Sequence, residues 1–373
     1  MTTVANDTQR EFAAVVRSFV VALGSDRPAE AKPFPFDLDR WRALSKLGGL
    51  LTLVPADAGG FFGSGGGAAD LVVMAEELGS GLAGAPFVPL AVAVAAIVDS
   101  PNIGLRNQLL ARIVDDSAIV GWHRRLPGER TSSTQLTARW SGDYVYLNGV
   151  IDGIDDLPEA IGVLVSVTTD DSGIGVAQLF VPTDVRGFSV MPQPALDLSR
   201  RFYRAQFQEV KLDRTHVLHP HGLPAMERQL GLALLLQSAD TVGATRHVFE
   251  ATMEYARDRY AFGRPLASFQ VIKHRFADMM VFVETAAGMV LESASRHDHR
   301  DSALAAAVAT KLYVAERAVE LVQSCVQIYG GVGVTWEHET HHYLRRVTTN
   351  MALCGTPSDH RRWLGAEMEN RYG

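Results

Sequence analysis

Two motifs in the second half of the chain combine the residue types that bind an anionic cofactor. Residues 259–266 have the sequence RYAFGRPL, and residues 327–331 have the sequence QIYGG. An arginine such as Arg259 can bind a pyrophosphate through paired hydrogen bonds, and Phe262 can cover an adenine or flavin face. A glycine pair lets the backbone approach a ligand closely. A helix cap followed by a core aromatic would use the same residue types, so chemistry alone leaves both interpretations open.

A third motif matches the H-E-x-x-H pattern of zinc-binding helices. Residues 338–342 have the sequence HETHH, which would place two histidines on one helix face with Glu339 as a base. A third ligand is not evident downstream, and the neighbours Trp336, Arg345 and Arg346 are typical of a solvated, charge-rich start of a helix. The sequence therefore predicts no metal site, and tightly held stoichiometric zinc in the pure protein would contradict this prediction.

The elements that must position these motifs fall into three successive parts. Residues 1–116 carry apolar residues at helical spacing. Residues 117–217 carry short β-branched and aromatic runs separated by turn signals such as Asn148-Gly149, and residues 218–373 return to the helical period. Short strands at this spacing predict a barrel, and long helices with short connections predict an antiparallel bundle. We therefore expect a multidomain α+β fold with an N-terminal helical domain, a central β-barrel and a C-terminal four-helix bundle.

The hydrophobic periodicity also sets the bounds of individual elements. Strands are expected at residues 118–122, 135–140, 144–147, 161–168, 176–181 and 202–212. Long helices are expected at residues 226–259, 269–298, 302–328 and 338–353, followed by a short tail.

Composition and charge narrow the class of protein. The chain has 373 residues, of which 47% are hydrophobic and 21% charged, as in an ordinary globular protein of two or three subdomains. A net charge of −7 argues against nucleic acid as the main ligand, since phosphate contacts need a basic face. Cys325 and Cys354 do not make a disulfide framework, and no apolar run is long enough to span a bilayer. We expect a soluble cytoplasmic protein without membrane or nucleic-acid partners.

Together these features resemble the acyl-CoA dehydrogenase family over nearly the whole chain. The residues similar to its C-terminal signature are 255–266, Phe269-Gln270, 274–279, Lys311 and 327–333, with further landmarks at 76–79 and 207–210. The resemblance implies FAD as cofactor, held at a subunit interface. It also implies an acyl-CoA substrate that is oxidised to its α,β-enoyl form, with a carboxylate taking the α-proton while the flavin takes the β-hydride. The residues that it implies as contacts to FAD are Arg259, Phe262, Gln270, Gln327, Gly330 and Gly331.

The departures from this family fall where the base should be. The common base is the glutamate of a Glu-Gly-Thr triplet, and here that triplet is Cys354-Gly355-Thr356. A minority of members place the glutamate near the start of the first bundle helix, where this chain has Ala233-Leu234. A thiol is poorly matched to abstracting an α-proton, because its pKa is about 8.5 and its reach differs from that of a carboxylate.

The β region departs as well. The family's Thr-Glu-Pro…Gly-Ser-Asp segment near the flavin is replaced by residues 122–133, with the sequence WHRRLPGERTSS. The segment that starts at Asn148-Gly149 lacks the family's lysine and, further on, the aromatic of its aromatic-Ile-Thr sequence. The chain therefore keeps the family's C-terminal cofactor motifs but lacks those of its β region.

Three hypotheses follow from this uneven retention. In the first, which we favour, the chain is the base-lacking subunit of a heteromeric α2β2 dehydrogenase, similar to members acting on steroid side-chain CoA esters. It would then need a homologous catalytic partner and contribute contacts at the ADP end of that partner's FAD. In the second, the chain is a self-sufficient homo-oligomeric flavoenzyme with a relocated base, Glu227 or Asp359. In the third, it is a non-catalytic scaffold of the same fold that has lost flavin.

Overall fold

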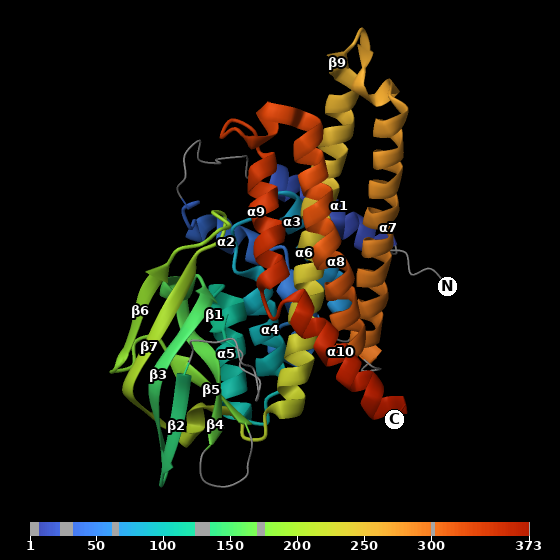
Figure 1. The fold of residues 1–373 in the computed structure, drawn as a ribbon. Helices are drawn as coiled ribbons and strands as arrows, with labels where there is room; N and C mark the ends of the chain where they lie inside the picture. The colour runs from blue at the N-terminus through green and yellow to red at the C-terminus, as the bar shows by residue number, and fades with distance from the viewer. Residues whose placement is uncertain are drawn as a thin grey trace.

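The chain folds as helices, then a β-sheet, then helices, in the predicted order (Figure 1). The computed structural model describes residues 7–22, 33–61, 67–123, 135–169, 176–299 and 303–372. Most of the segment at residues 122–133, where the sequence differs from that of the resembled family, lies outside these ranges.

The N-terminal part is a group of helices packed against the C-terminal part. Its helices are α1 (Asp7–Ala22), α2 (Leu38–Ser45), α3 (Ala68–Ser80), α4 (Phe87–Val98) and α5 (Ile103–Asp116). A Cβ atom at Gly79 of α3 would lie 2.0 Å from the carbonyl oxygen of Asp240, and one at Gly243 would lie 1.8 Å from that of Glu76. Asp240 and Gly243 lie on the long helix α6 (Leu223–Asp258) of the C-terminal part. The backbones of α3 and α6 therefore touch, which only glycine at both crossing points allows.

The central part is one sheet. Its strands are β1 (Ile119–Trp122), β2 (Gln135–Ser141), β3 (Tyr144–Asp155), β4 (Ala160–Thr169), β5 (Val176–Pro182), β6 (Phe188–Gln193), β7 (Phe202–Asp213) and β8 (Val217–His219). The sheet order is β6-β7-β3-β2-β4-β5-β8, with β1 paired in parallel to β4. All six predicted strands form, and β6 and β8 are additional.

The predicted turn at Asn148-Gly149 is wrong, because β3 continues through it to Asp155. The pairing of β3 with β7 shifts register between Leu147 and Gly149, and Gly149 has a φ of 128°. The glycine therefore forms a β-bulge inside a strand, a conformation that uses the same residue type as a turn.

The C-terminal part contains the helices that carry the two cofactor motifs. They are α6 (Leu223–Asp258), α7 (Gln270–His299), α8 (Ala303–Tyr329), α9 (Thr340–Ala352) and α10 (Pro357–Tyr372). The four predicted helices form within a few residues of their expected bounds, and the expected tail is the helix α10. Within the described residues, none of the helices is both long and apolar enough to cross a membrane.

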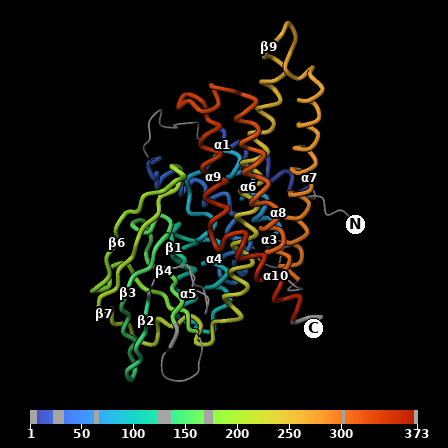
Figure 2. Tube along the Cα trace, in the orientation of Figure 1, coloured from blue at the N-terminus to red at the C-terminus, as the bar shows by residue number. Residues whose placement is uncertain are grey.

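The connection from α6 to α7 is a hairpin made of β9 (Tyr260–Ala261) and β10 (Arg264–Pro265). It projects from one end of the molecule, well away from the sheet (Figure 1, Figure 2). The first cofactor motif therefore lies at an exposed tip.

Candidate functional site

The first cofactor motif forms a tight turn whose aromatic ring points into solvent. Phe262 has a φ of 53° and its side chain is 97% exposed, and Gly263 follows with a φ of 79°. The ring of Phe262 meets that of Phe269 edge-on, with centroids 6.4 Å apart, and the Arg264 guanidinium lies 4.0 Å from the centroid of Phe269. A ring this exposed contributes nothing to the core of this chain, so the alternative interpretation as a core aromatic is wrong.

Arg259 and Gln270 flank this turn. Arg259 is exposed at the end of α6, and its carbonyl accepts a hydrogen bond of 2.8 Å from the Leu266 amide, which closes the hairpin. Gln270 is exposed at the start of α7, and its Nε2 lies 2.7 Å from His274 Nε2. An exposed guanidinium, an exposed ring and an exposed amide thus share one short segment.

The second cofactor motif lies at the end of α8. Gln327, Gly330 and Gly331 are exposed, and Gly330 has a φ of 69°. A Cβ atom at either glycine would have nothing within 4 Å. The rings of Tyr255 on α6 and Tyr329 on α8 lie 4.5 Å apart, which holds the two helix ends together. The two motifs therefore lie at the same end of the bundle, and the residues that carry them are exposed.

Cys354 stands where the family's base is expected, in the turn between α9 and α10. Its backbone is in the left-handed region, with a φ of 59°, and Gly355 follows with a φ of 110°. The thiol sulfur accepts a hydrogen bond of 3.3 Å from Gln237 Nε2 on α6. The half-buried Cys354 side chain also packs against a small apolar cluster that includes Leu230 and Leu234. The thiol is therefore held by the bundle, facing an amide and aliphatic groups.

A buried lysine lies one hydrogen bond further on. Lys311 Nζ donates to Gln237 Oε1 at 2.9 Å and to the Asn350 carbonyl at 2.5 Å. The side chain is 1% exposed, and burial lowers the pKa of Lys311 to about 8. Both of these acceptors are neutral oxygens, and the attractive interactions of Lys311 with Cys354 and Asp240 offset the effect of burial only in part.

The two alternative base residues have surroundings that do not favour that role. Glu227 is exposed in the first turns of α6, ten residues and therefore roughly 15 Å before Gln237 along the helix. Asp359 accepts hydrogen bonds from the amide and the hydroxyl of Thr356, at 3.0 and 2.6 Å, and so caps α10. The hydroxyl of Thr356 lowers the pKa of Asp359, which weakens it as a base.

The H-E-x-x-H residues do not form the helical arrangement that a zinc site needs. His338 precedes α9, and its Nδ1 lies 2.6 Å from the Thr340 hydroxyl. Glu339 bonds to His247 at 2.8 Å, and His342 is buried with its ring 5.6 Å from that of Phe34. In the parts of the chain that the structure covers, no group of three or more His, Cys, Asp or Glu side chains could hold a metal ion.

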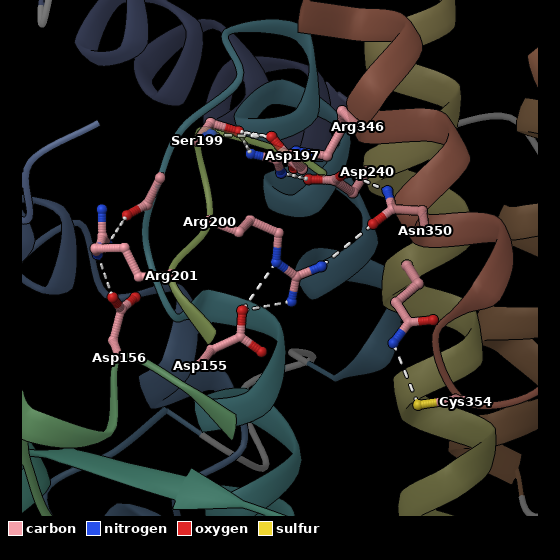
Figure 3. A network of polar contacts seen from close by, with 12 residues as sticks. Asp155, Asp156, Asp197, Ser199, Arg200, Arg201, Asp240, Arg346, Asn350 and Cys354 are labelled. Atoms are coloured by element: carbon pink, nitrogen blue, oxygen red, sulfur yellow. Dashed lines mark hydrogen bonds and ion pairs between the residues drawn. The ribbon is translucent and has the colours of Figure 1, made fainter. Parts of the chain in front are cut away.

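Arg346 is the centre of a buried ionic network that the sequence did not reveal (Figure 3). It contacts Asp197 Oδ2 at 2.6 Å, Asp240 Oδ2 at 2.9 Å and the Ser199 hydroxyl at 2.7 Å. The prediction that Arg346 belongs to a solvated helix start is wrong, since its side chain is 4% exposed. Two carboxylates from distant segments compensate its charge, and local sequence carries no signal for either.

Two consecutive arginines extend this network to the other parts (Figure 3). Arg200 contacts Asp155 Oδ1 at 2.7 Å and Asn350 Oδ1 at 3.3 Å. Arg201 pairs with Asp156 and donates to the carbonyls of Phe34 at 3.0 Å and Gly84 at 2.6 Å. Arg200 therefore joins the sheet to α9, and Arg201 joins the sheet to the N-terminal part.

Comparison with known proteins identifies the N-terminal and C-terminal helical parts. The model of the acyl-CoA dehydrogenase N-terminal domain matches residues 6–116, and that of the acyl-CoA dehydrogenase C-terminal domain matches residues 220–368. The acyl-CoA dehydrogenase IpdE2 of Mycolicibacterium smegmatis is 28% identical over 347 residues, which cover 92% of each chain.

Solved structures share the whole fold. Butyryl-CoA dehydrogenase from Megasphaera elsdenii superposes with a TM-score of 0.89 at 20% identity, over 99% of this chain and 100% of that one. A chain of the ChsE4-ChsE5 complex from Mycobacterium tuberculosis superposes with a TM-score of 0.88 at 24% identity, over 99% of each chain. The chain therefore belongs to the acyl-CoA dehydrogenase family, a family of FAD-dependent oxidoreductases.

Proposed function

We propose that this chain is the base-lacking subunit of a heteromeric acyl-CoA dehydrogenase, active only with a homologous catalytic partner. The reaction of the complex is the α,β-desaturation of an acyl-CoA thioester, such as the CoA ester of a steroid side chain. The observation that carries the proposal is the environment of residue 354, where a thiol bound to Gln237 replaces the expected carboxylate.

Proton abstraction is the step that this chain is not equipped to perform. FAD supplies the hydride acceptor for the reaction, and the protein must supply a base beside the α-carbon. The thiol of Cys354 is a poor base for that proton, and Leu234, at the alternative position, is fully buried among aliphatic groups. Lys311 donates to Gln237 and Asn350, so its protonated nitrogen faces acceptors and offers no lone pair to a substrate.

Cofactor binding is the step for which this chain is equipped. Arg259, Phe262 and Gln270 are exposed on the α6–α7 hairpin, and the glycines that end α8 are open. These groups provide a guanidinium for a pyrophosphate, a ring for an adenine and backbone amides that a ligand can approach. The hairpin projects from one end of the molecule, away from the sheet (Figure 1), as expected of groups that serve a neighbouring subunit.

The relatives support a partner of the same family. One of the solved chains that share this fold belongs to a complex named for two proteins, ChsE4 and ChsE5. Another comes from a steroid dehydrogenase likewise named for two proteins, Tcur3481 and Tcur3483. A second chain of this fold would bring its own sheet and the residue at its position equivalent to Cys354 to the shared cofactor.

The test is co-expression of this chain with a second family member, followed by counting FAD and measuring turnover. We expect the purified complex to hold one FAD per two chains and to desaturate an acyl-CoA, whereas this chain alone does neither. Arg259→Ala should lower FAD retention in the complex, and Arg296→Ala, near the far end of α7 and paired with Glu292, is the matched control. A chain that is FAD-replete and active when expressed alone would refute the proposal.

A further inference from the structure

The side chain of Arg200 crosses from the sheet to the helix that leads to Cys354 (Figure 3). Its Nε and Nη2 bind Asp155 Oδ1 at 2.8 and 2.7 Å, and its Nη1 binds Asn350 Oδ1 at 3.3 Å. The side chains of Arg200 and Asp155 are both 12% exposed. Because one guanidinium bonds at both ends, nothing can lie between Asp155 and Asn350 without breaking one of these contacts.

The Asn350 end of this bridge is itself fixed. Asn350 Nδ2 donates to Asp240 Oδ1 at 2.6 Å and to the Thr241 hydroxyl at 3.1 Å, and Asn350 is 1% exposed. Its carbonyl accepts from Lys311, the lysine that reaches Cys354 through Gln237. The Arg200 charge also helps to lower the pKa of Lys311, although burial is the larger cause. The bridge therefore ends beside the residues that surround the thiol.

A desaturation site at residue 354 would need open space on this side. The thioester would have to lie against the side chain at residue 354, with a flavin ring on its other face. Asn350 lies in the last turn of α9, four residues before Cys354. Arg200 bonds to Asn350 and to Asp155 of the sheet, so a ligand entering from the sheet would meet the guanidinium of Arg200 first. Displacing it would leave the mostly buried Asp155 without its cation, which is costly.

Building on the proposed function, we propose that Arg200 closes this chain's own acyl-thioester site. The bridge from Asp155 to Asn350 excludes both substrate and flavin ring from the space in front of Cys354. A pair of subunits then holds one open reaction site, in the partner, and this chain serves as the closed half.

Cys354 itself reports whether the space is open. The mixed disulfide of coenzyme A with 2-thiopyridine is a probe of suitable size and chemistry. The Cys354 thiolate attacks it, a Cys354–CoA disulfide forms, and 2-thiopyridone leaves with the electron pair and absorbs light. Cys325 is fully buried and its pKa is raised to about 11 by burial, so it labels only if the fold loosens.

We expect Arg200→Ala to raise the rate of CoA transfer to Cys354 by about tenfold, the effect of losing a charged hydrogen bond, with Cys325 unlabelled. Asp155→Asn, which keeps Arg200 but weakens its anchor, should raise the rate less. Arg204→Ala is the matched control. Arg204 on β7 pairs at 2.6 Å with Asp152, which lies on the same strand β3 as Asp155, and its removal should leave the rate unchanged.

Two results would overturn the inference. One is an Arg200→Ala rate equal to that of the unaltered chain. The other is labelling of Cys325 together with Cys354 in both variants, which would make the bridge a structural support only. Neither measurement requires the partner, so failure here is distinct from failure of the proposed function, which is decided by FAD content and turnover.

Discussion

Lys311 and Cys354 share one hydrogen-bond partner. The Gln237 amide accepts from Lys311 Nζ at 2.9 Å through its oxygen and donates to Cys354 Sγ at 3.3 Å through its nitrogen. The amide can do both because its two ends have opposite polarity. The arrangement links a buried cation to the Cys354 thiol through one amide.

The depressed pKa of Lys311 predicts a stability gain at alkaline pH. The pKa is about 8 in the folded chain and 10.5 in the reference state, so the unfolded chain binds more protons between these values. The contribution of Lys311 is therefore fully present above pH 10.5 and is lost as the pH falls through 8. Urea unfolding between pH 8 and 10 should show the unaltered chain gaining up to about 1.4 kcal/mol per pH unit relative to Lys311→Met. Parallel pH profiles of the two proteins would contradict this assignment.

The raised pKa of Asp156 predicts that the unfolding free energy falls as the pH rises through the acidic range. Burial raises its pKa from 3.8 to about 6, against the opposing effect of Arg201. The folded chain then binds the proton more tightly, so the contribution is present below pH 3.8 and is lost as the pH rises through 6. Unfolding free energies from pH 4 to 6.5 should fall for the unaltered chain relative to Asp156→Asn. The exposed substitution Asp57→Asn should reproduce the unaltered profile, and a flat difference for Asp156→Asn would rule the assignment out.

Removing Arg346 should be among the most damaging single changes. Arg346→Met leaves Asp197 and Asp240 buried without their cation, which typically costs about 3–5 kcal/mol. Arg345→Met, at the next position, removes a guanidinium whose contacts are the Leu196 carbonyl and the Trp336 ring, and should cost far less. Chemical unfolding of both variants checks this, and equal losses would show that the network stabilises little. Combining Arg346→Met with Asp240→Asn should recover part of the loss.

Phe262→Ala should separate cofactor binding from stability. The ring is 97% exposed, so the unfolding free energy of the isolated chain should not change measurably. In the complex, loss of stacking on an adenine costs about 1–3 kcal/mol, which is a weakening of FAD binding of about tenfold or more. Phe61→Ala, at an exposed ring of the N-terminal part, is the control. A Phe262→Ala complex that retains FAD as tightly as the unaltered one would remove Phe262 from the site.

The sequence predicted those parts of the fold that local periodicity determines. Five of the six expected strands and the long helices formed near their expected bounds, whereas β3 continues to Asp155, well past its expected end at Leu147. Strand β6 was missed because it alternates exposed and partly buried residues and contains Pro192, so it shows no apolar run. The Asn148-Gly149 bulge was taken for a turn because both structures use a glycine with positive φ.

The site was predictable only where its residues are close in sequence. Arg259, Phe262 and Gln270 lie within one short segment, and their types pointed to a cofactor. Arg200 and Asn350 are separated by 150 positions, and Arg346 and Asp240 by 106. Nothing in a local window distinguishes such arginines from solvated ones, because the compensating carboxylates come from other parts of the fold.

The reciprocal glycine contact between α3 and α6 has a consequence for residue 354. The carbonyl of Asp240 abuts Gly79, while the carboxylate of the same residue holds Arg346 and Asn350. Any side chain at Gly79 would push α6 away and carry Asp240 with it, and Asn350 would follow. A substitution in the N-terminal helices, far from the thiol in sequence, would thus change the geometry around Cys354. The geometry at residue 354 therefore depends on the spacing of α3 and α6, which is set at two glycines far from the thiol in sequence.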